Sequence, residues 1–279
     1  RKIFKKDSVM KYIYITNDPE LAKYACDCGI DNIMIDLETI GKDQRQKNLD
    51  TVKSSHELHD IKHIKKHIKN SKSKIITRIN PLYKNSKIEI NTSIKYGTDY
   101  IMLPMFNNKN EVKEVIDLID NRVKLILLFE TPKSIINIDS ILKLKKIDEA
   151  FIGLNDLSIA FNLNFMFELL PSSLIELMTK KFKKRKIPFG IGGISRIGSG
   201  KLDSKLILSE HVRLGSTKVI ISRSFTNKAK NLMELNRMMD FQNEISLLTN
   251  EYNSLKKLNY SVVSDNKKQV LSTLEEIVK

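Results

Sequence analysis

Ionisable side chains stand at the ends of several short apolar runs in this sequence of 279 residues. Asp36 and Glu38 end one run, and Arg78, Glu130 and Asp156 end or follow three others. Two carboxylates held close together repel each other, and a hard divalent cation relieves that repulsion. We therefore expect Glu130 and Asp156 to bind Mg²⁺ or Mn²⁺, which prefer oxygen ligands and leave positions open for waters and substrate oxygens.

Eight apolar runs of this kind alternate with helix-length segments, which is the pattern of a parallel sheet built from βα units. Each run is short and consists mostly of Ile, Val, Leu, Met or Phe, as expected for strands buried on both faces. The runs are residues 12–16, 32–38, 74–80, 99–105, 123–130, 149–154, 187–192 and 218–222. Eight regular units favour a closed (β/α)₈ TIM barrel, with an open doubly wound sheet as the alternative.

In such a barrel the carboxyl ends of the strands form the active site, so the acids and the arginine would meet at one mouth. These strand ends carry more charge than a structural rim needs, so we predict that a ligand binds beside Arg78, Asp36 and Glu38. A purely structural interpretation stays open, because Asp156 could cap a following helix and Glu130 could be a first-turn acid.

The pattern changes near the C-terminus. From Asn227 we expect a long helical stretch, a polar break and a final short helix over residues 270–278. We therefore divide the chain into an N-terminal leader (1–9), a barrel (10–226) and a C-terminal helical extension (227–279). The extension either caps the bottom of the barrel or docks on another subunit, and we favour a homo-oligomer formed through these helices.

Composition narrows the class of protein. The net charge is +15, but the lysine runs lie on expected amphipathic helices without interleaved aromatic residues, so we expect no nucleic-acid partner. No segment approaches the roughly 20 apolar residues of a membrane span. The two cysteines, Cys26 and Cys28, cannot easily pair along one helix, which indicates a reducing compartment. We expect a cytoplasmic protein.

Three segments of the chain resemble a known family in order and spacing. They are Leu128-Phe129-Glu130-Thr131-Pro132, Asn137-Ile138-Asp139-Ser140-Ile141-Leu142 and Phe151-Ile152-Gly153-Leu154-Asn155-Asp156-Leu157-Ser158. Together they resemble the core of the HpcH/HpaI aldolase and citrate lyase β-subunit family. Supporting matches surround Asp36, Arg78 and Pro104, so the resemblance covers about residues 12–225.

The resemblance implies a TIM barrel that acts as a metal-dependent carbon–carbon lyase or aldolase on a small 2-oxo acid such as pyruvate or oxaloacetate. In that family the acids matching Glu130 and Asp156 hold Mg²⁺ or Mn²⁺, and the arginine matching Arg78 contacts the oxygen of pyruvate or its enolate. The metal and Arg78 would stabilise the enolate that forms when the bond breaks. Asp36 and Glu38 would order waters or support the site through hydrogen bonds.

Several positions depart from the family pattern. Aldolases of the family typically carry a histidine and an aspartate where this chain has Thr39 and Lys95, and a glutamine where it has Leu128. Neither a threonine nor a charged lysine replaces a histidine poised near neutrality as a general base. The citrate lyase branch often has an acid at Thr39 and a lysine at Met105. The alternative hypothesis is therefore a catalytically divergent barrel that binds a ligand or a partner.

A glycine-rich segment, residues 189–200, follows the seventh run, and Ser222-Arg223-Ser224 follows the eighth. Barrels often bind phosphate between these two loops through backbone N–H groups. We expect Gly192 and Gly193, together with Gly153 and Asn155, to contact the substrate, with a phosphorylated or sugar-derived substrate as one option. Glycines that only permit tight turns are the alternative.

The histidines form a separate group. His56, His59, His63 and His67 are predicted to share the exposed face of a helix whose apolar side packs on the barrel. His211 is a reserve candidate for an acid or base.

Overall fold

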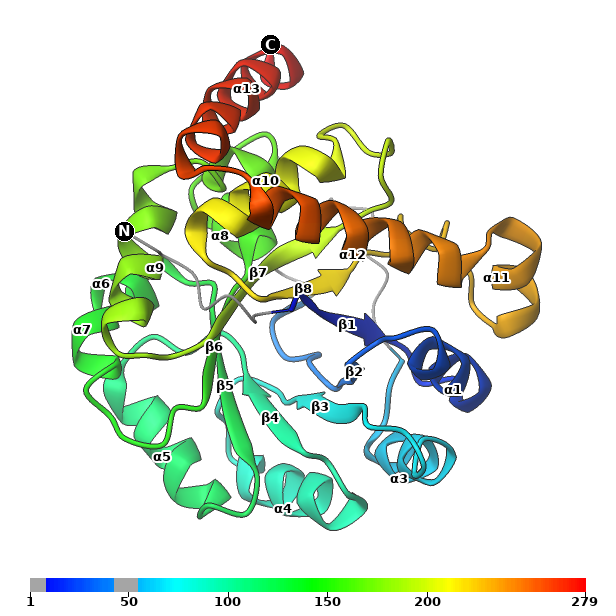
Figure 1. Ribbon diagram of the computed structural model, residues 1–279. Helices are drawn as coiled ribbons and strands as arrows, with labels where there is room; N and C mark the ends of the chain where they lie inside the picture. The colour runs from blue at the N-terminus through cyan, green and yellow to red at the C-terminus, as the bar shows by residue number, and fades with distance from the viewer. Residues whose placement is uncertain (1–8, 43–54) are drawn as a thin grey trace.

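The structure is a computed structural model, described over residues 9–42 and 55–279. Its eight strands form a closed barrel in which each strand is parallel to its neighbours (Figure 1). They are β1 (Lys11–Ile15), β2 (Asn32–Asp36), β3 (Lys74–Arg78), β4 (Tyr100–Leu103), β5 (Lys124–Phe129), β6 (Glu149–Ile152), β7 (Phe189–Ile194) and β8 (Lys218–Ile221). The predicted (β/α)₈ barrel is confirmed. Strand β7 ends two residues later than predicted, and its pairing with β8 is irregular between Gly190 and Gly193.

Helices connect the strands and lie outside the barrel. Local signals set their ends: the side chain of Asp18 accepts a hydrogen bond from Leu21 at the start of the first helix, and Gly97 ends another with φ of 99°. The helices are α1 (Pro19–Asp27), α3 (Leu58–His67), α4 (Ser86–Tyr96), α5 (Lys109–Ile119), α6 (Pro132–Ile136), α7 (Ile138–Ile141), α8 (Leu154–Ala160), η1 (Met166–Leu169), α9 (Ser173–Lys184) and α10 (Ser204–Leu214).

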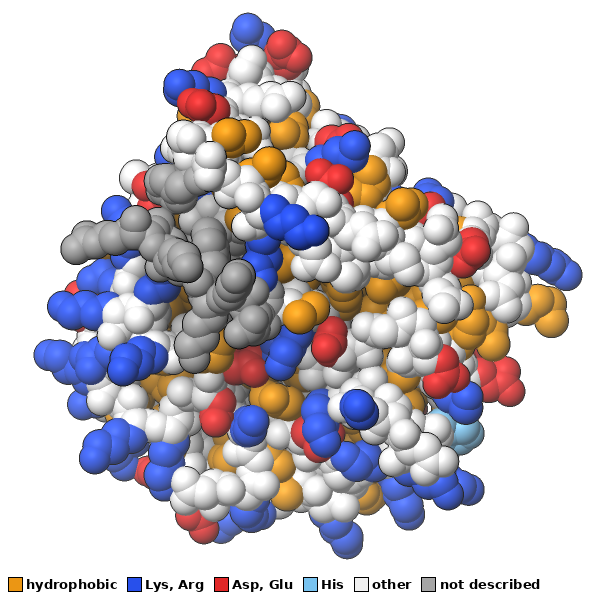
Figure 2. All heavy atoms as spheres, viewed as in Figure 1, with side chains coloured by type: hydrophobic (Ala, Val, Ile, Leu, Met, Phe, Trp, Pro, Cys, Tyr) orange, Lys and Arg blue, Asp and Glu red, His pale blue; other side chains and the backbone are white. Residues whose placement is uncertain are grey.

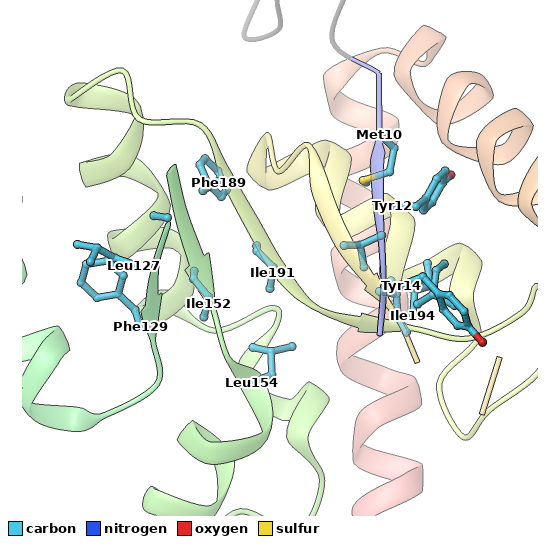
Figure 3. Packing of buried hydrophobic residues seen from close by; sticks show 14 of the residues in the cluster. Met10, Tyr12, Tyr14, Leu127, Phe129, Ile152, Leu154, Phe189, Ile191 and Ile194 are labelled. Atoms are coloured by element: carbon cyan, nitrogen blue, oxygen red, sulfur yellow. The ribbon is translucent and has the colours of Figure 1, made fainter. Parts of the chain in front are cut away.

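Alternation along the strands divides the buried side chains into two cores. The inner core fills the barrel and includes Ile13, Met34, Ile76 and Phe151. The outer core lies between the strands and the helices, and Figure 3 shows part of it, with Phe129, Ile152 and Ile191 among the labelled residues. Because the inner core closes the barrel, polar residues of the same alternation reach solvent only at its two ends.

The chain ends in helices α11 (Leu232–Met238), α12 (Phe241–Lys257) and α13 (Tyr260–Val278). The predicted short final helix over residues 270–278 is wrong, because α13 has 19 residues. The polar residues that suggested a break belong to this helix, whose buried residues Val263 and Val270 are seven positions apart. An interval of seven keeps two residues on one helix face, so a polar stretch between them need not end the helix.

Helix α12 packs against the barrel between α10 and α11 (Figure 1). The ring of Phe241 lies 5.7 Å from that of Tyr14 in β1, and the hydroxyl of Tyr252 donates to the carbonyl of Ser216, two residues before β8. Helix α12 therefore covers the outer side of β1 and β8.

Lysine and arginine side chains are spread over the visible face rather than gathered in one patch (Figure 2). Within residues 9–42 and 55–279, none of the helices combines the length and the apolar character that a membrane crossing requires.

Candidate functional site

Arg78 and Asp36 form a two-pronged ion pair at the carboxyl ends of β3 and β2. The two residues are register partners in the sheet, and both side chains point into the barrel mouth because they follow Ile76 and Met34 at a spacing of two. Nε and Nη2 of Arg78 donate to the two carboxylate oxygens of Asp36 at 2.8 and 2.7 Å. This geometry fixes the plane of the guanidinium group.

A second cation reinforces the pair. Nζ of Lys42 lies 2.9 Å from Oδ2 of Asp36, and both side chains are buried. Burial alone would raise the pKa of Asp36, but Arg78 and Lys42 outweigh it and hold the pKa far below its usual value. Asp36 is therefore ionised near neutral pH, and it acts as an anchor rather than as a proton carrier.

Glu130 has the opposite electrostatic environment. The residue is 3% exposed, and its carboxyl group accepts a hydrogen bond, 3.1 Å long, from the N–H of Met105. Burial and the negative charges of Glu38 and Asp156 raise the pKa of Glu130 well above its usual value, against the opposing influence of Arg78. The structural interpretation of Glu130 as a first-turn acid is wrong, because Thr131 caps α6 and Glu130 lies inside the barrel mouth.

Gly153 makes room for the Glu130 carboxylate. A Cβ atom at this position would lie 2.8 Å from Oε2 of Glu130, which is closer than real contacts allow. Gly153 immediately precedes α8, and Asn155 and Asp156 follow in the first turn of that helix. The main-chain oxygen of Asn155 accepts a hydrogen bond from Ser158. The strand–turn–helix connection thus brings Asp156 within electrostatic range of Glu130.

The mouth has a charge that suits a divalent cation. Its acid cluster consists of Asp36, Glu38, Glu130 and Asp156, and its cations among the described residues are Arg78 and Lys42. Carboxylate oxygens are the ligands that Mg²⁺ and Mn²⁺ prefer. In the described part of the chain, no three His, Cys, Asp or Glu side chains are arranged to hold a metal. A cation held by Glu130 and Asp156 alone would take its remaining ligands from water or substrate, as is usual for Mg²⁺.

Two residues without a predicted role brace the loop after β2. Oδ1 of Asn80 accepts hydrogen bonds from the N–H groups of Thr39 and Ile40, at 2.9 and 3.0 Å, and its Nδ2 donates to Glu89. The N–H of Asp36 donates to Nδ1 of His56 at 3.0 Å. An asparagine at the end of a strand was a visible signal for Asn80. His56 lies 20 positions from Asp36 in the chain, so no sequence signal linked the two residues.

The histidine predictions are confirmed in part. His59, His63 and His67 are exposed on α3, as expected. His56 is the exception, because it precedes α3 and is half-buried against Asp36. His211 is buried at the end of α10 with Nδ1 2.9 Å from Oγ of Ser216, next to the start of β8. It therefore lies at the opposite end of the barrel from the acid cluster, and the reserve role as an acid or base in this site is wrong.

Gly192 and Gly193 lie in the irregular end of β7. Gly192 has φ of 50°, and a Cβ atom there would lie 2.8 Å from a methyl group of Leu154, the first residue of α8. A Cβ atom on Gly193 would make ordinary van der Waals contacts, 3.5 Å from the carbonyl oxygen of Ile220 and 3.8 Å from Cβ of Ser222. Both glycines therefore border the connections that carry Asp156 and Ser222.

Solved structures of similar fold come from aldolases and related enzymes. The HpcH/HpaI aldolase from Desulfitobacterium hafniense DCB-2 aligns with a TM-score of 0.63 and 12% identity, over 84% of this chain and 95% of that one. An HpcH/HpaI aldolase/citrate lyase family protein from Burkholderia cenocepacia J2315 aligns with a TM-score of 0.63 and 12% identity, over 80% of this chain and 91% of that one. Citrate synthase SbnG aligns with a TM-score of 0.59 and 13% identity, over 88% of this chain and 95% of that one. At such low identity these likenesses show the fold. No curated protein matches the sequence significantly.

Family membership comes from the sequence itself. Residues 12–164, more than half of the chain, match the HpcH/HpaI aldolase/citrate lyase family. The matched segment contains Asp36, Arg78, Glu130 and Asp156. The chain is thus a divergent member of the HpcH/HpaI aldolase/citrate lyase family.

Proposed function

We propose that this protein is a carbon–carbon lyase or aldolase that depends on Mg²⁺ or Mn²⁺ and acts on a small 2-oxo acid of the pyruvate or oxaloacetate type. The observation that supports it best is the environment of Glu130. A buried carboxylate beside two other acids is unfavourable in the absence of a cation, so its placement at the barrel mouth favours a metal ligand over a structural residue.

Glu130 and Asp156 would hold the metal in this proposal. When bound, the ion would act as a Lewis acid that draws electron density from the keto oxygen of the substrate. Gly153 keeps the space around the Glu130 carboxylate open, and Asn155, Gly192 and Gly193 would line the remainder of the substrate position.

Arg78 would supply the second positive group. Its Nε and Nη2 are held by Asp36, while Nη1 has no hydrogen-bond partner among the described residues. A guanidinium group oriented in this way has one edge anchored and one available for a substrate oxygen. Asp36, Lys42 and Glu38 would orient Arg78, so that negative charge developing on an enolate oxygen meets a donor already in place.

The proton-transfer group of the reaction has no counterpart at the family positions. Thr39 Oγ1 is 3.3 Å from Asn80 Oδ1, and Lys95 is exposed on α4. This observation favours the second candidate function, a catalytically divergent barrel that binds a ligand or partner. The two functions differ in turnover, because only the first converts oxaloacetate or an aldol to pyruvate.

Calorimetric titration of Mg²⁺ and Mn²⁺ into metal-free protein, with and without pyruvate or oxaloacetate, tests the metal site. We expect binding that pyruvate tightens and that Glu130→Ala and Asp156→Ala each abolish. Asp139→Ala is the matched control, because this acid is exposed on α7 and pairs only with Lys181 among described partners. Absence of metal binding in the wild type would sink the proposed enzyme and favour the divergent barrel.

The assembly and the compartment belong to the same proposal. Leu258, Val262 and Leu271 are 42–45% exposed in and beside α13, which supports a homo-oligomer formed through the C-terminal helices. Sedimentation should show that Val262→Glu dissociates the oligomer, while Leu177→Glu on α9 leaves it intact. An unchanged mass for Val262→Glu would contradict this interface. The free thiols of Cys26 and Cys28 support a cytoplasmic location.

A further inference from the structure

Four serine hydroxyls meet where the loops after β7 and β8 come together. Ser195 and Ser199 belong to the first loop, and Ser222 and Ser224 belong to the second. Oγ of Ser195 lies 2.9 Å from Oγ of Ser199 and 3.3 Å from Oγ of Ser224, which in turn lies 2.8 Å from Oγ of Ser222. We call these residues the serine cluster.

The hydrogen bonds of the serine cluster run in one direction. Oγ of Ser199 donates to the carbonyl of Arg196 at 2.9 Å, so Ser195 must donate to Ser199. Ser224 donates to Ser195, so Ser222 must donate to Ser224. The four hydroxyl hydrogens thus satisfy one another in a chain that ends on a single backbone carbonyl. Such hydroxyls can rotate to donate to an incoming acceptor, because only weak neutral bonds are exchanged.

The serine cluster faces the barrel mouth. Ser222 follows Ile220 at a spacing of two, and Ile220 packs against the inner core, so Ser222 continues the inward face of β8. Gly193, on the neighbouring strand, places no side chain in front of Ser222. An oxyanion of a ligand in the mouth can therefore approach the hydroxyls and the glycine backbone together.

The same two loops hold an arginine with an unused donor. Nη2 of Arg196 donates to Oδ1 of Asn227 at 2.9 Å and ties the loop after β7 to the loop after β8. Nε of Arg196 is buried and has no hydrogen-bond partner among the described residues. A buried guanidinium donor without an acceptor is unfavourable, and an anionic oxygen would relieve it.

We propose that the serine cluster, together with Gly193 and Arg196, binds a phosphate group, and that the substrate of this barrel is a phosphorylated compound whose phosphate lies opposite its 2-oxo acid end. The identity of the substrate rests on the proposed function, whereas the phosphate subsite does not. Hydroxyls, backbone N–H groups and a guanidinium group are the usual donors to phosphate, and the loops after the seventh and eighth strands are its usual place in this fold.

Calorimetric titration with inorganic phosphate tests the subsite, with acetate at equal ionic strength as the comparison. Phosphate should bind at millimolar concentrations and acetate should not. Ser195→Ala and Arg196→Met should each weaken phosphate binding at least tenfold. The matched controls, Ser246→Ala and Arg237→Met, alter exposed residues of α12 and α11 and should leave it unchanged.

The result is separable from that of the metal titration. The Glu130→Ala variant should bind phosphate as the wild type does, so a failed metal titration with intact phosphate binding would sink the lyase and keep the subsite. Circular dichroism shows whether each variant is folded. No binding of phosphate by the folded wild type, equal binding of acetate, or an equal loss in Arg237→Met would overturn the subsite.

Discussion

Individual residues at the barrel mouth fall into two electrostatic groups. Asp36 is neutralised by Arg78 and Lys42 and stays ionised, whereas Glu130 is buried among acids that raise its pKa. The first group can hold an arginine in place, and the second can accept a cation. The difference between the two groups leads to one prediction about the surroundings of Glu130 and one about Arg78.

Replacing Gly153 by alanine should impair the metal site indirectly. The added methyl group would lie 2.8 Å from Oε2 and 2.9 Å from Cβ of Glu130, so the carboxylate must move. We expect Mg²⁺ affinity to fall about tenfold or more and the free energy of unfolding to fall by about 1–3 kcal/mol. Calorimetry and urea denaturation measure the two effects. Wild-type metal affinity in Gly153→Ala would show that Glu130 is not a ligand.

Replacing Arg78 by lysine should separate substrate binding from metal binding. A lysine ammonium group cannot span both oxygens of Asp36 and also present a third donor to the mouth. We expect pyruvate affinity to fall by roughly tenfold or more, with Mg²⁺ affinity changed only slightly. The exposed Arg237→Lys is the control. Equal pyruvate affinity in wild type and Arg78→Lys would assign Arg78 a purely structural role.

His211 should make stability depend on pH. Burial lowers its pKa to about 3, so the folded protein keeps the ring neutral while the unfolded chain protonates it near its usual value of about 6.5. The unfolded state then binds more protons, and the free energy of unfolding falls as the pH drops below about 6.5. Between pH 7 and 5 the loss is roughly 2 kcal/mol. Urea denaturation of His211→Gln should show a smaller loss, and an equal loss would contradict the assignment.

At the scale of elements, three aspartates fix the pairing of neighbouring strands. Each aspartate immediately precedes a strand: Asp31 precedes β2, Asp99 precedes β4 and Asp148 precedes β6. Each side chain accepts a hydrogen bond of 2.9 Å from the second residue of the preceding strand, whose carbonyl accepts the aspartate N–H in return. A reciprocal pair of bonds of this kind sets register where the strands begin. The carboxyl ends are left to carry the site.

Asn80 fixes the loop after β2 through side-chain hydrogen bonds, as the three aspartates fix the strand starts. Removing its side chain takes an acceptor from the N–H groups of Thr39 and Ile40 and a donor from the carboxyl group of Glu89, which still accepts from the main-chain N–H of residue 80. We expect Asn80→Ala to lower the free energy of unfolding by about 2–4 kcal/mol and to weaken pyruvate binding, because this loop leads to Lys42. Glu89→Gln keeps the bond to Asn80 and should be nearly neutral. Urea denaturation checks both, and equal effects of the two changes would contradict the role of Asn80.

The sequence was sufficient to predict the strands, because each is a short apolar run between helical segments. It also placed Arg78, Glu130 and Asp156 at strand ends. It could not place Lys42 or His56, because their contacts with Asp36 depend on how the chain returns after β2. Helix α13 was underestimated, because its polar residues occupy a solvent face, and the division of the chain at residue 226 stays a prediction.

At the scale of the whole molecule, the C-terminal helices differ in how they support the barrel. Helix α13 buries Val263, Val270 and Leu274 and pairs Lys267 with Glu176 of α9. Removal of residues 259–279 should lower the free energy of unfolding by at least about 2 kcal/mol and leave a cooperative transition. Removal of residues 232–279 also uncovers Tyr14 and Phe225 and should abolish cooperative unfolding. Circular dichroism during urea titration distinguishes the two truncations, and cooperative unfolding of the shorter chain would contradict the role of α12.

The hydrogen bond from Thr249 in α12 to the Tyr12 hydroxyl in β1 spans 237 positions of the chain. The first strand of the barrel therefore acquires its outer cover only after helix α12, more than 200 residues later in the chain, has been synthesised. Contacts between such distant segments slow folding, since a long loop must close before they form. During translation the outer apolar faces of β1 and β8 stay exposed until α12 leaves the ribosome. We expect chaperones to bind the nascent chain during this interval, because they bind exposed apolar surface.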